Sequence, residues 1–582
     1  MLSKNKSIRV RLKSPYFTGV LLILYTLIFY LFSLCPTVYL IDSGELAAVS
    51  YTLGIAHPTG YPLYTLISYF FAHLPGEPVF NLNILSALFT AAAVFLTYLF
   101  SRSVIKKSPI SIIPAILLAF APTIWRTSIT NEVYPLTVLF ASAILFLLFK
   151  IRDERDFYIL MYVIGLAFTN HVIVFTVAVP AVLYAAVVYR PSAKQFIVGL
   201  LFALLGGSLY LYLIIRTLGG AELHWGDTYN LQRLLWHITG KQYRVWMFSL
   251  PFSEIFINLQ KGILILLIRD FLYIFLIPIF VGFYVLFKNE RKKFWFFSTV
   301  IVFNFLYAVN YSIPDIESYY IPALVSFISV LGFGLTRLKK ILPWFVTIPL
   351  ALAIPFLNYN SCTLRNNTFA YDLSYAHIRE LPKNSLVLFT LWDIYSPLLY
   401  LQKVKGIRKD LVLIDKELLR RTWYIRFLKN EYPEFYKKVE NSINSYLVEL
   451  YKFEYDKPYN PALIQMRFIN LLESFIEAKL DEHVYLIMPF PDRDLNQTKI
   501  DYHWIPRGLV FEIKKETACD THFDFSKLAL EKPAVVNDER LNHMINIVER
   551  MAYYNITYLK TQKRFTEAAE IKNWLENSFP SQ

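Results

Sequence analysis

Apolar residues gather in long runs over the first part of the chain. Eleven runs can be traced, at 17–40, 79–101, 109–125, 134–150, 157–169, 171–189, 195–215, 262–287, 294–309, 319–336 and 341–357. Most have the length of about 17–25 residues that an α-helix needs to cross a bilayer. The 157–169 run is short, and residues 62–77 fit a further re-entrant or interfacial helix. The pattern predicts a polytopic α-helical membrane protein with about 11 transmembrane helices.

The pattern changes near residue 358. Short apolar runs bounded by polar residues follow at 385–390, 410–415 and 483–488. They alternate with helical patterns such as 418–430, so we expect an α/β unit with a small, mostly parallel sheet. Two more helical patterns cover 539–579. The chain is therefore predicted to contain a multi-spanning domain, 1–357, and a C-terminal α/β domain with a helical tail, 358–582.

Composition agrees with a membrane protein. Hydrophobic residues make up 55% of the 582 residues and charged residues 18%, whereas a soluble domain carries about 25% charge. The 48 phenylalanines and 41 tyrosines fit lipid contact and interfacial belts. A net charge of +14 would suit nucleic acid, but the basic residues lie in short loops between apolar runs. We therefore expect no nucleic-acid partner.

The basic loops set the expected topology. They are 102–107, 150–155, 190–194, 288–293 and 337–340, and the segment before the first run is basic as well. They alternate with loops poor in lysine, and the positive-inside rule places the basic ones in the cytoplasm. An odd number of spans then puts the C-terminal domain outside. The first run is too long for a signal peptide and lacks a cleavage site, so we expect a retained helix.

Three cysteines occur in the chain. Cys35 lies in the first apolar run, and Cys362 and Cys519 lie far apart in the C-terminal part. Their spacing matches no metal site. A disulfide between Cys362 and Cys519 is one alternative in an oxidising compartment, and free thiols are the other.

The polar residues that could take part in catalysis or binding all fall in loops on the predicted outer side. They are Asp42, Glu45, His57 and Tyr61 in the first loop; Arg126, Asn131, Glu132 and Tyr134 in the second; Asn170 and His171 at the next turn; Trp225, Asp227, His237, Lys241 and Tyr243 in the fourth; and Asp315, Glu317, Tyr319 and Tyr320 in the fifth. This convergence predicts one site on the outer face.

The segment around Asp42 and Glu45 directly follows the first apolar run. Charged groups near hydrocarbon are costly, so the default interpretation is a functional site. A carboxylate there suits a general base, because partial desolvation raises its pKa. The alternative is a capping box, in which Asp42 caps a helix and Glu45 closes the motif. For His57, phosphate binding competes with a simple turn at Pro58.

The other outer residues also have structural alternatives. Glu132 fits a loop cap, Trp225 fits packing, and Asp315 fits an interfacial anchor before the aromatic pair. No Ser-His-Asp order, zinc spacing or nucleotide motif stands out. Carboxylates together with histidine, arginine and lysine at an outer surface suit group transfer from a lipid phosphate. Such a donor carries its own leaving group, so no nucleotide is needed.

Taken together, the motifs resemble a known family. They are Asp42-Ser43-Gly44-Glu45, His57-Pro58-Thr59-Gly60-Tyr61-Pro62-Leu63, Glu132-Val133-Tyr134, Asn170-His171, Trp225-Gly226-Asp227, His237 to Tyr243, and Asp315 before Tyr319-Tyr320. Their order resembles the bacterial membrane family related to the animal transmembrane protein O-mannosyltransferase of plexin-type receptors, within the GT-C superfamily. The resemblance covers residues 15 to about 430. Thr59 departs from it, because the family usually has a second proline there.

The resemblance implies an inverting transfer of mannose or another hexose from a polyprenyl-phosphate carrier to a hydroxyl. Asp42 maps onto the catalytic base, with Glu45 as its rival. Glu132 would assist acceptor or sugar binding. The remaining substrate- and phosphate-binding candidates are His57, Tyr61, Arg126, Tyr134, Asn170, His171, Asp227, His237, Lys241, Tyr243 and Asp315.

The same resemblance sets the expected partners. They are the polyprenyl-phosphate sugar donor, the lipid bilayer and a hydroxyl acceptor, for which an exported protein's serine or threonine competes with a lipid or a glycan. We expect no cofactor, although the carboxylates could hold a divalent metal. The expected location is the bacterial inner membrane, with the active site and C-terminal domain extracytoplasmic. A flippase for lipid-linked sugar is the second hypothesis and a scaffold the third; carriers, however, place carboxylates near the midplane of repeated halves.

Overall fold

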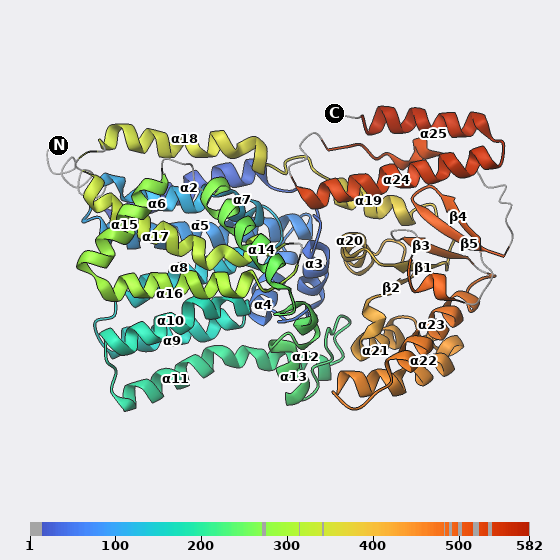
Figure 1. Cartoon of the computed structure of the whole chain (residues 1–582), viewed down its shortest axis with the longest axis horizontal. Coiled ribbons are helices and arrows are strands. Elements are labelled where there is room, and N and C mark those ends of the chain that lie inside the picture. Colours follow the sequence, from blue (N-terminus) through green and yellow to red (C-terminus); the bar gives the residue numbers. More distant parts are fainter. Residues whose placement is uncertain are drawn as a thin grey trace. The chain divides into compact units, whose positions relative to one another are not determined.

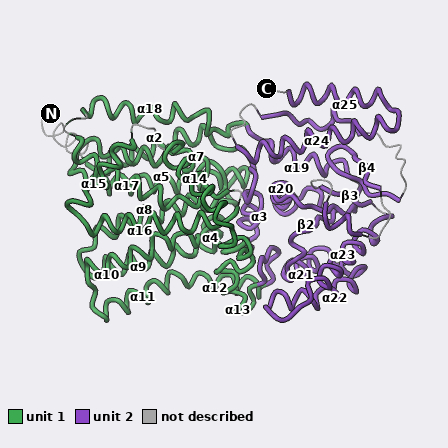
Figure 2. The backbone as a smooth tube through the Cα atoms, viewed as in Figure 1, with its two compact units in different colours: residues 1–36, 55–219, 228–366 green, residues 37–54, 220–227, 367–582 purple. Residues whose placement is uncertain are grey.

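The computed structural model describes residues 14–270, 275–313, 315–339, 341, 343–481, 483–487, 492–498, 503–515, 523–533 and 538–580. The chain forms two compact units, each assembled from separate stretches of sequence (Figure 2). Unit 1 comprises Met1–Pro36, Ile55–Gly219 and Thr228–Asn366, and unit 2 comprises Thr37–Gly54, Gly220–Asp227 and Asn367–Gln582. Two short stretches from the first part of the chain therefore belong with the C-terminal part.

Unit 1 consists of helices (Figure 1). The α-helices are α2 (Pro15–Ser33), α4 (Pro62–Ala72), α5 (Pro78–Val104), α6 (Ile113–Phe120), α7 (Pro122–Ser128), α8 (Tyr134–Leu148), α9 (Glu154–Phe168), α10 (Phe175–Val188), α11 (Ala193–Gly207), α12 (Leu211–Leu218), α13 (Leu231–Ile238), α14 (Phe252–Leu264), α15 (Leu276–Asn289), α16 (Arg291–Ala308), α17 (Ile321–Leu338) and α18 (Trp344–Cys362). Each apolar run of the sequence overlaps at least one of them. The chain is thus an integral membrane protein built on apolar helices.

The number of membrane crossings is a separate matter from the number of helices. Among the described residues, five helices are long and apolar enough to cross a bilayer, or six if the pair α6 and α7, bent by 60°, counts as one span. Four apolar helices are shorter, among them α8 and α15. The predicted count of about 11 and the inside-outside topology stay predictions. Residues 1–13, which include the basic N-terminal segment, lie outside the described residues.

Small residues allow the helices of unit 1 to pack closely. A Cβ atom on Gly334 of α17 would collide with the backbone carbonyl of Pro278 in α15. Without a hydrophobic driving force between helices in lipid, close backbone approach at small residues is the main source of helix association. The helices α15 and α17 are therefore closely packed against each other.

Unit 2 is an α/β unit (Figure 1). Its helices are α3 (Ser43–Thr52), α19 (Phe369–Ile378), α20 (Trp392–Lys403), α21 (Thr422–Glu431), α22 (Pro433–Glu454), α23 (Pro461–Glu477), α24 (Glu539–Thr561) and α25 (Phe565–Ser578). Its strands are β1 (Leu386–Phe389), β2 (Val412–Asp415), β3 (Val484–Ile487), β4 (His503–Arg507) and β5 (Val510–Lys514). The two helical patterns of the tail are α24 and α25.

The sheet has the strand order β2-β1-β3-β5-β4. The three apolar runs predicted to be strands are β1, β2 and β3; β1 pairs in parallel with both neighbours, and all three are fully buried. The hairpin of β4 and β5 is antiparallel and was not predicted. Its outer strand contains Pro506, which is tolerated at a sheet edge but weakens the sequence signal for a strand. The sheet therefore has two parallel and two antiparallel pairs, so the prediction of a mostly parallel sheet is wrong for the described strands.

The structure describes two of the three cysteines. Cys35 and Cys362 are buried and carry free thiols. Cys519, the second half of the disulfide alternative, lies outside the described residues.

Candidate active site

The predicted base, Asp42, precedes α3 in unit 2. Its side chain makes no capping hydrogen bond to the helix, so the capping box offered as an alternative is wrong. Instead, Oδ1 of Asp42 accepts a hydrogen bond of 2.8 Å from the indole N–H of Trp392, the first residue of α20. The carboxylate is half-buried. Asp42 is therefore oriented by a side chain from the C-terminal part of the chain.

The backbone before Asp42 is fixed by the same part of unit 2. The amide of Ile41 donates to Oδ1 of Asp393 at 2.8 Å, and Arg540 pairs with that same oxygen at 2.9 Å. Ile41 has a φ of 64°, a conformation that is costly for a β-branched residue and persists only where its surroundings hold it. The hydrogen bond to Asp393 stabilises this conformation of Ile41, next to which Asp42 contacts Trp392.

The first turn of α3 lies directly on α20. The amide of Glu45 donates to the hydroxyl oxygen of Ser396 at 2.9 Å. A Cβ atom on Gly44 would collide with the Ser396 backbone carbonyl, so only glycine fits there. Glu45 is buried, with 2% of its surface exposed. The motif Asp42-Ser43-Gly44-Glu45 is thus a docking turn as well as a source of carboxylates.

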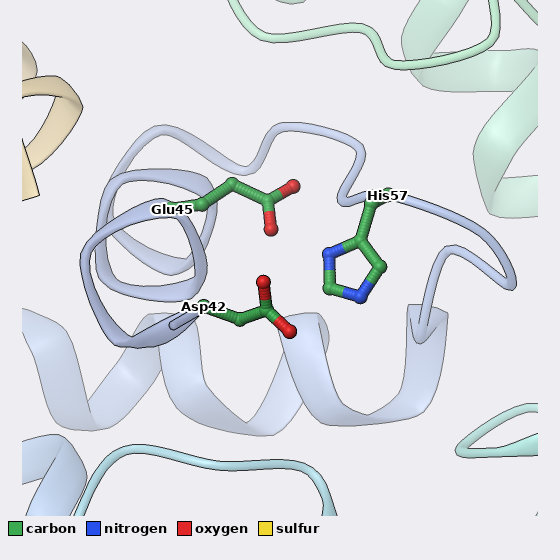
Figure 3. Close-up of side chains that lie close together, drawn as sticks. All are labelled: Asp42, Glu45 and His57. Carbon is green, nitrogen blue, oxygen red and sulfur yellow. The ribbon is translucent and has the colours of Figure 1, made fainter. Parts of the chain in front are cut away.

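Asp42, Glu45 and His57 are close in sequence, and their side chains also lie close together in space. In Figure 3 their side chains point toward one another, and one potential ligand atom from each lies within 4.8 Å of the others. Two carboxylates and an imidazole at this spacing suit proton transfer, and they also match the donor types of a divalent cation site. This grouping was expected from the shared loop.

A second group of predicted residues forms a connected cluster inside unit 1. The Tyr61 hydroxyl lies 2.9 Å from Nε2 of His57, and the Tyr61 ring stacks on His171 at 5.8 Å. His171 in turn contacts the ring of Tyr134, whose hydroxyl donates to Oδ2 of Asp315 at 3.0 Å. Five candidates from four separate loops thus meet in one place. We call His57, Tyr61, Tyr134, His171 and Asp315 the aromatic-histidine cluster.

The protonation of His171 follows from its surroundings. Its Nδ1 accepts a hydrogen bond from the amide of Ile173 at 3.1 Å. The neutral ring therefore carries its proton on Nε2, where it can donate a hydrogen bond. His171 can therefore act as a hydrogen-bond donor through Nε2.

Two other candidates hold backbone in place. The amide nitrogen of Asn170 donates to the carbonyl of Val133 at 3.1 Å and to Thr137 at 2.9 Å, which fixes the start of α8. Nε2 of His237 lies 3.1 Å from the carbonyl of Ala56, next to His57. Burial lowers the pKa of His237 to about 3, so this ring is neutral as well. Asn170 thus holds the backbone next to Tyr134, and His237 holds the backbone next to His57.

The remaining candidates make other contacts. Arg126 donates to the carbonyl of Ser361 at 2.9 Å, and Glu132 donates its amide to Ser86 at 3.4 Å. In unit 2, Asp227 pairs with Arg426 at 2.6 Å. Lys241 lies over the Trp236 ring at 3.8 Å, and Tyr243 stacks on Trp246 at 5.7 Å.

Several residues of the site were missed from the sequence. The resemblance covers Trp392 and Asp393 but gave them no role, and Arg540 lies beyond it. Nothing in a single sequence links these residues to a turn hundreds of residues away. Arg269 lies within the apolar run 262–287, where an ionisable residue is itself a functional signal. Its guanidinium binds both oxygens of Glu317, at 2.9 and 2.5 Å.

Comparisons with known proteins agree with these motifs. Residues 42–195 match the family described as Protein O-mannosyl-transferase TMEM260 N-terminal domain. The Dictyostelium discoideum protein O-mannosyl-transferase tmem260 is 23% identical over 585 residues, covering 88% of this chain and 68% of that protein. The Mus musculus protein O-mannosyl-transferase TMEM260 is 24% identical over 433 residues, covering 67% of this chain and 61% of that protein.

Two solved structures also resemble the chain. ArnT from Cupriavidus metallidurans bound to undecaprenyl phosphate is 12% identical, with a TM-score of 0.47, covering 86% of this chain and 98% of that one. The Archaeoglobus fulgidus oligosaccharyltransferase in complex with Zn and sulfate is 13% identical, with a TM-score of 0.38, covering 71% and 69%.

The family match and the two relatives support the class of protein predicted from the motifs, a membrane glycosyltransferase. Within that class, the predicted resemblance to the transmembrane protein O-mannosyltransferases is confirmed.

Proposed function

We propose that the chain is an inverting glycosyltransferase that moves a hexose, mannose by resemblance, from a polyprenyl-phosphate carrier to a hydroxyl acceptor. The names of the relatives support mannose and a protein serine or threonine. The observation that carries the proposal is the carboxylate of Asp42, which Trp392 orients beside Glu45 and His57. The site and the C-terminal domain are extracytoplasmic, and the host membrane is a bacterial inner membrane.

Asp42 is the base of the proposed reaction. The indole N–H of Trp392 donates to Oδ1 and orients the carboxylate, which accepts the proton of the acceptor hydroxyl. The acceptor oxygen forms a bond to the anomeric carbon from the face opposite the phosphate. The bond from that carbon to the phosphate oxygen breaks, and polyprenyl phosphate leaves with the electron pair. A nearby carboxylate also stabilises the oxocarbenium-like transition state.

The departing phosphate needs hydrogen-bond donors and positive charge. Nε2 of the neutral His171 supplies a donor, and Arg126 supplies charge. Arg269 is an additional candidate, because its Nε is buried and has no partner while its other nitrogens bind Glu317 and Thr123. Charge-assisted hydrogen bonds of this kind strengthen as negative charge grows on the leaving group. No cofactor takes part in the proposed step.

The test is donor turnover by the purified protein in nanodiscs. Wild type and Asp42→Asn receive polyprenyl-phosphate mannose and a cell-envelope extract, and released polyprenyl phosphate is measured. Loss of a general base lowers turnover by roughly 10²–10⁴-fold. The matched control is Asp153→Asn. Asp153 caps α9, and asparagine caps a helix as well as aspartate does, so turnover stays at the wild-type level.

Each other outcome has a defined meaning. Equal turnover in wild type and Asp42→Asn, together with a loss in Glu45→Gln, transfers the role of base to Glu45. Movement of intact donor across proteoliposomes without release of polyprenyl phosphate contradicts the proposal and supports a flippase. Neither movement nor turnover, across several sugars, supports a scaffold.

A further inference from the structure

Unit 1 contains a cavity of about 940 Å³ that lies away from the candidate site. It is lined by the C-terminal ends of α5, α8, α10, α15 and α17 and by the first turn of α16. Its charged lining residues are Lys106, Glu290, Lys293, Arg337 and Lys339. A volume of this size is in the upper part of the range for small-molecule sites, about 300–1,000 Å³.

Positive charge dominates this cavity. Glu290 is the one carboxylate among the described lining residues, and it pairs with Lys293 at 2.7 Å. Lys106, Arg337 and Lys339 add three more cationic groups. The Lys293 ammonium also lies 5.7 and 5.6 Å from the ring centres of Phe149 and Phe333. The cavity thus combines a cationic rim with an aromatic wall, which suits an anion attached to an apolar body.

The helices that line the cavity carry cluster residues at their other ends. Tyr134 begins α8, and His171 and Asp315 directly precede the helical segments that contain α10 and α17. The segment Ile316–Leu338 has 23 residues. At 1.5 Å per residue it is about 35 Å long, which matches the roughly 30 Å hydrocarbon core of a bilayer. The cavity therefore lies one membrane thickness from the aromatic-histidine cluster.

We propose that this cavity binds the phosphate headgroup of an anionic phospholipid of the opposite leaflet. Residues 102–107, 288–293 and 337–340, three of the basic loops predicted to be cytoplasmic, contribute its cationic groups. Basic pockets between membrane helices on the cytoplasmic side are the typical binding places of anionic lipid headgroups. Lys106, Lys293, Arg337 and Lys339 form charge-assisted hydrogen bonds to the phosphate oxygens. The aromatic wall contacts the glycerol and the first acyl carbons.

The test measures lipid binding and needs no enzyme activity. Phosphatidylglycerol is titrated into the full chain in detergent, and native mass spectrometry measures the fraction of protein with bound lipid. Phosphatidylcholine is the zwitterionic reference. We expect tighter binding of phosphatidylglycerol. The double variant Lys293→Gln with Arg337→Gln removes two cationic groups, each worth about 1 kcal/mol near an anionic lipid, so its affinity falls about thirty-fold.

A matched control separates the cavity from general surface charge. Arg291 and Lys292 are exposed on the same turn of α16 and do not line the cavity. The double variant Arg291→Gln with Lys292→Gln loses the same charge and keeps wild-type affinity. The swap Lys293→Arg with Arg337→Lys keeps both charges and should also bind, which would assign the affinity to the two charges rather than to the particular side chains.

Three results would overturn the proposal. The first is equal affinity for the two lipids. The second is an equal loss in the cavity and control variants. The third is competition for the site by polyprenyl phosphate or inorganic phosphate at the same concentration as phosphatidylglycerol, which would assign the cavity to the carrier or to free phosphate.

Discussion

The indole N–H of Trp392 donates a hydrogen bond of 2.8 Å to Oδ1 of Asp42, although 350 residues separate the two along the chain. Both belong to unit 2. The C-terminal part of the chain therefore contributes directly to the orientation of the proposed base, and its role can be tested through the contacts that hold the turn 39–45.

Replacing Trp392 by phenylalanine should lower kcat with little change in KM. An aromatic ring is kept, but the hydrogen bond to a carboxylate, worth about 1.5–3 kcal/mol, is lost, which corresponds to a fall in kcat of about 13- to 160-fold. Separate measurement of kcat and KM tests this. Trp574→Phe is the control, because Trp574 packs on Phe525 in the helical tail and should leave both constants unchanged. A rise in KM alone would show that Trp392 binds substrate instead.

Asp393 should control the mobility of the turn before Asp42. Asp393→Ala removes the acceptor for the Ile41 amide and the partner of Arg540, whereas Asp393→Asn keeps an oxygen for the amide. Hydrogen exchange at the amides of 39–46 should therefore increase in the order wild type, Asn, Ala. Asp524→Ala, which removes an exposed local cap, is the control. Unchanged exchange in Asp393→Ala would show that the strained turn is held by other contacts.

Gly44→Ala should impair the docking of α3 on α20. The added Cβ meets the Ser396 carbonyl, and overpacking of this kind costs about 1–3 kcal/mol. Gly207→Ala is a matched control, because no atom lies within 4 Å of its added Cβ. Donor turnover and thermal unfolding of both variants distinguish the two positions. Wild-type turnover in Gly44→Ala would contradict the close contact between the helices.

The stability of unit 2 should depend on the ionisation of Asp415. Burial raises the pKa of this carboxyl to about 7, against a smaller opposing effect of hydrogen bonds from the Glu417 and Leu418 amides. Because the folded state holds the proton more tightly than the unfolded chain, this contribution is fully present below about pH 4. It is lost at about 1.4 kcal/mol per pH unit as pH rises toward 7.

Asp415→Asn isolates that effect. The amide keeps an oxygen for the two backbone donors but cannot ionise, so the fall in stability between about pH 4 and 7 should become shallower. Thermal unfolding of both proteins across this range provides the measurement. Parallel curves for wild type and variant would mean that Asp415 does not titrate in this window.

Turnover should survive treatment with a chelator. The proposed reaction uses Asp42 as a base and protein donors for the phosphate, although Asp42, Glu45 and His57 have the spacing of a cation site. Donor turnover after EDTA and dialysis is therefore expected to equal that of the untreated protein. If EDTA abolishes turnover, Mg²⁺ or Mn²⁺ restores it, and the metal fails to restore it in His57→Ala, then these three residues form a metal site.

The sequence predicts local features of this protein better than distant ones. The helices that overlap the apolar runs of unit 1 and the strands β1, β2 and β3 were predicted correctly, because the hydrophobic pattern that indicates each of them lies within a single segment. The proximity of Asp42 and His57 is also predicted, since one loop carries both. Trp392 and Arg540 are not predictable, because their partners are set by tertiary packing of a unit whose pieces are far apart in sequence.

The sequence also could not separate residues that line a site from residues that support it. Asn170 and His237 have side chains suited to substrate, yet they bind backbone carbonyls at Val133 and Ala56. Arg269 was hidden by the apolar residues around it. In each case the direction of the side chain, which a linear pattern does not contain, decides the role.

Unit 2 is assembled from stretches that lie far apart in the sequence, and this has a consequence for biosynthesis. The stretch Thr37–Gly54 leaves the ribosome early, and the residues that fix it, from Trp392 to Arg540, are made much later. At about 5–20 residues per second, the 350 residues from Asp42 to Trp392 take roughly 20 to 70 s to synthesise. The growing chain must therefore hold Asp42 and Glu45 without their contacts from the C-terminal part. Assembly of the turn that carries the proposed base is therefore one of the last events in the maturation of the protein.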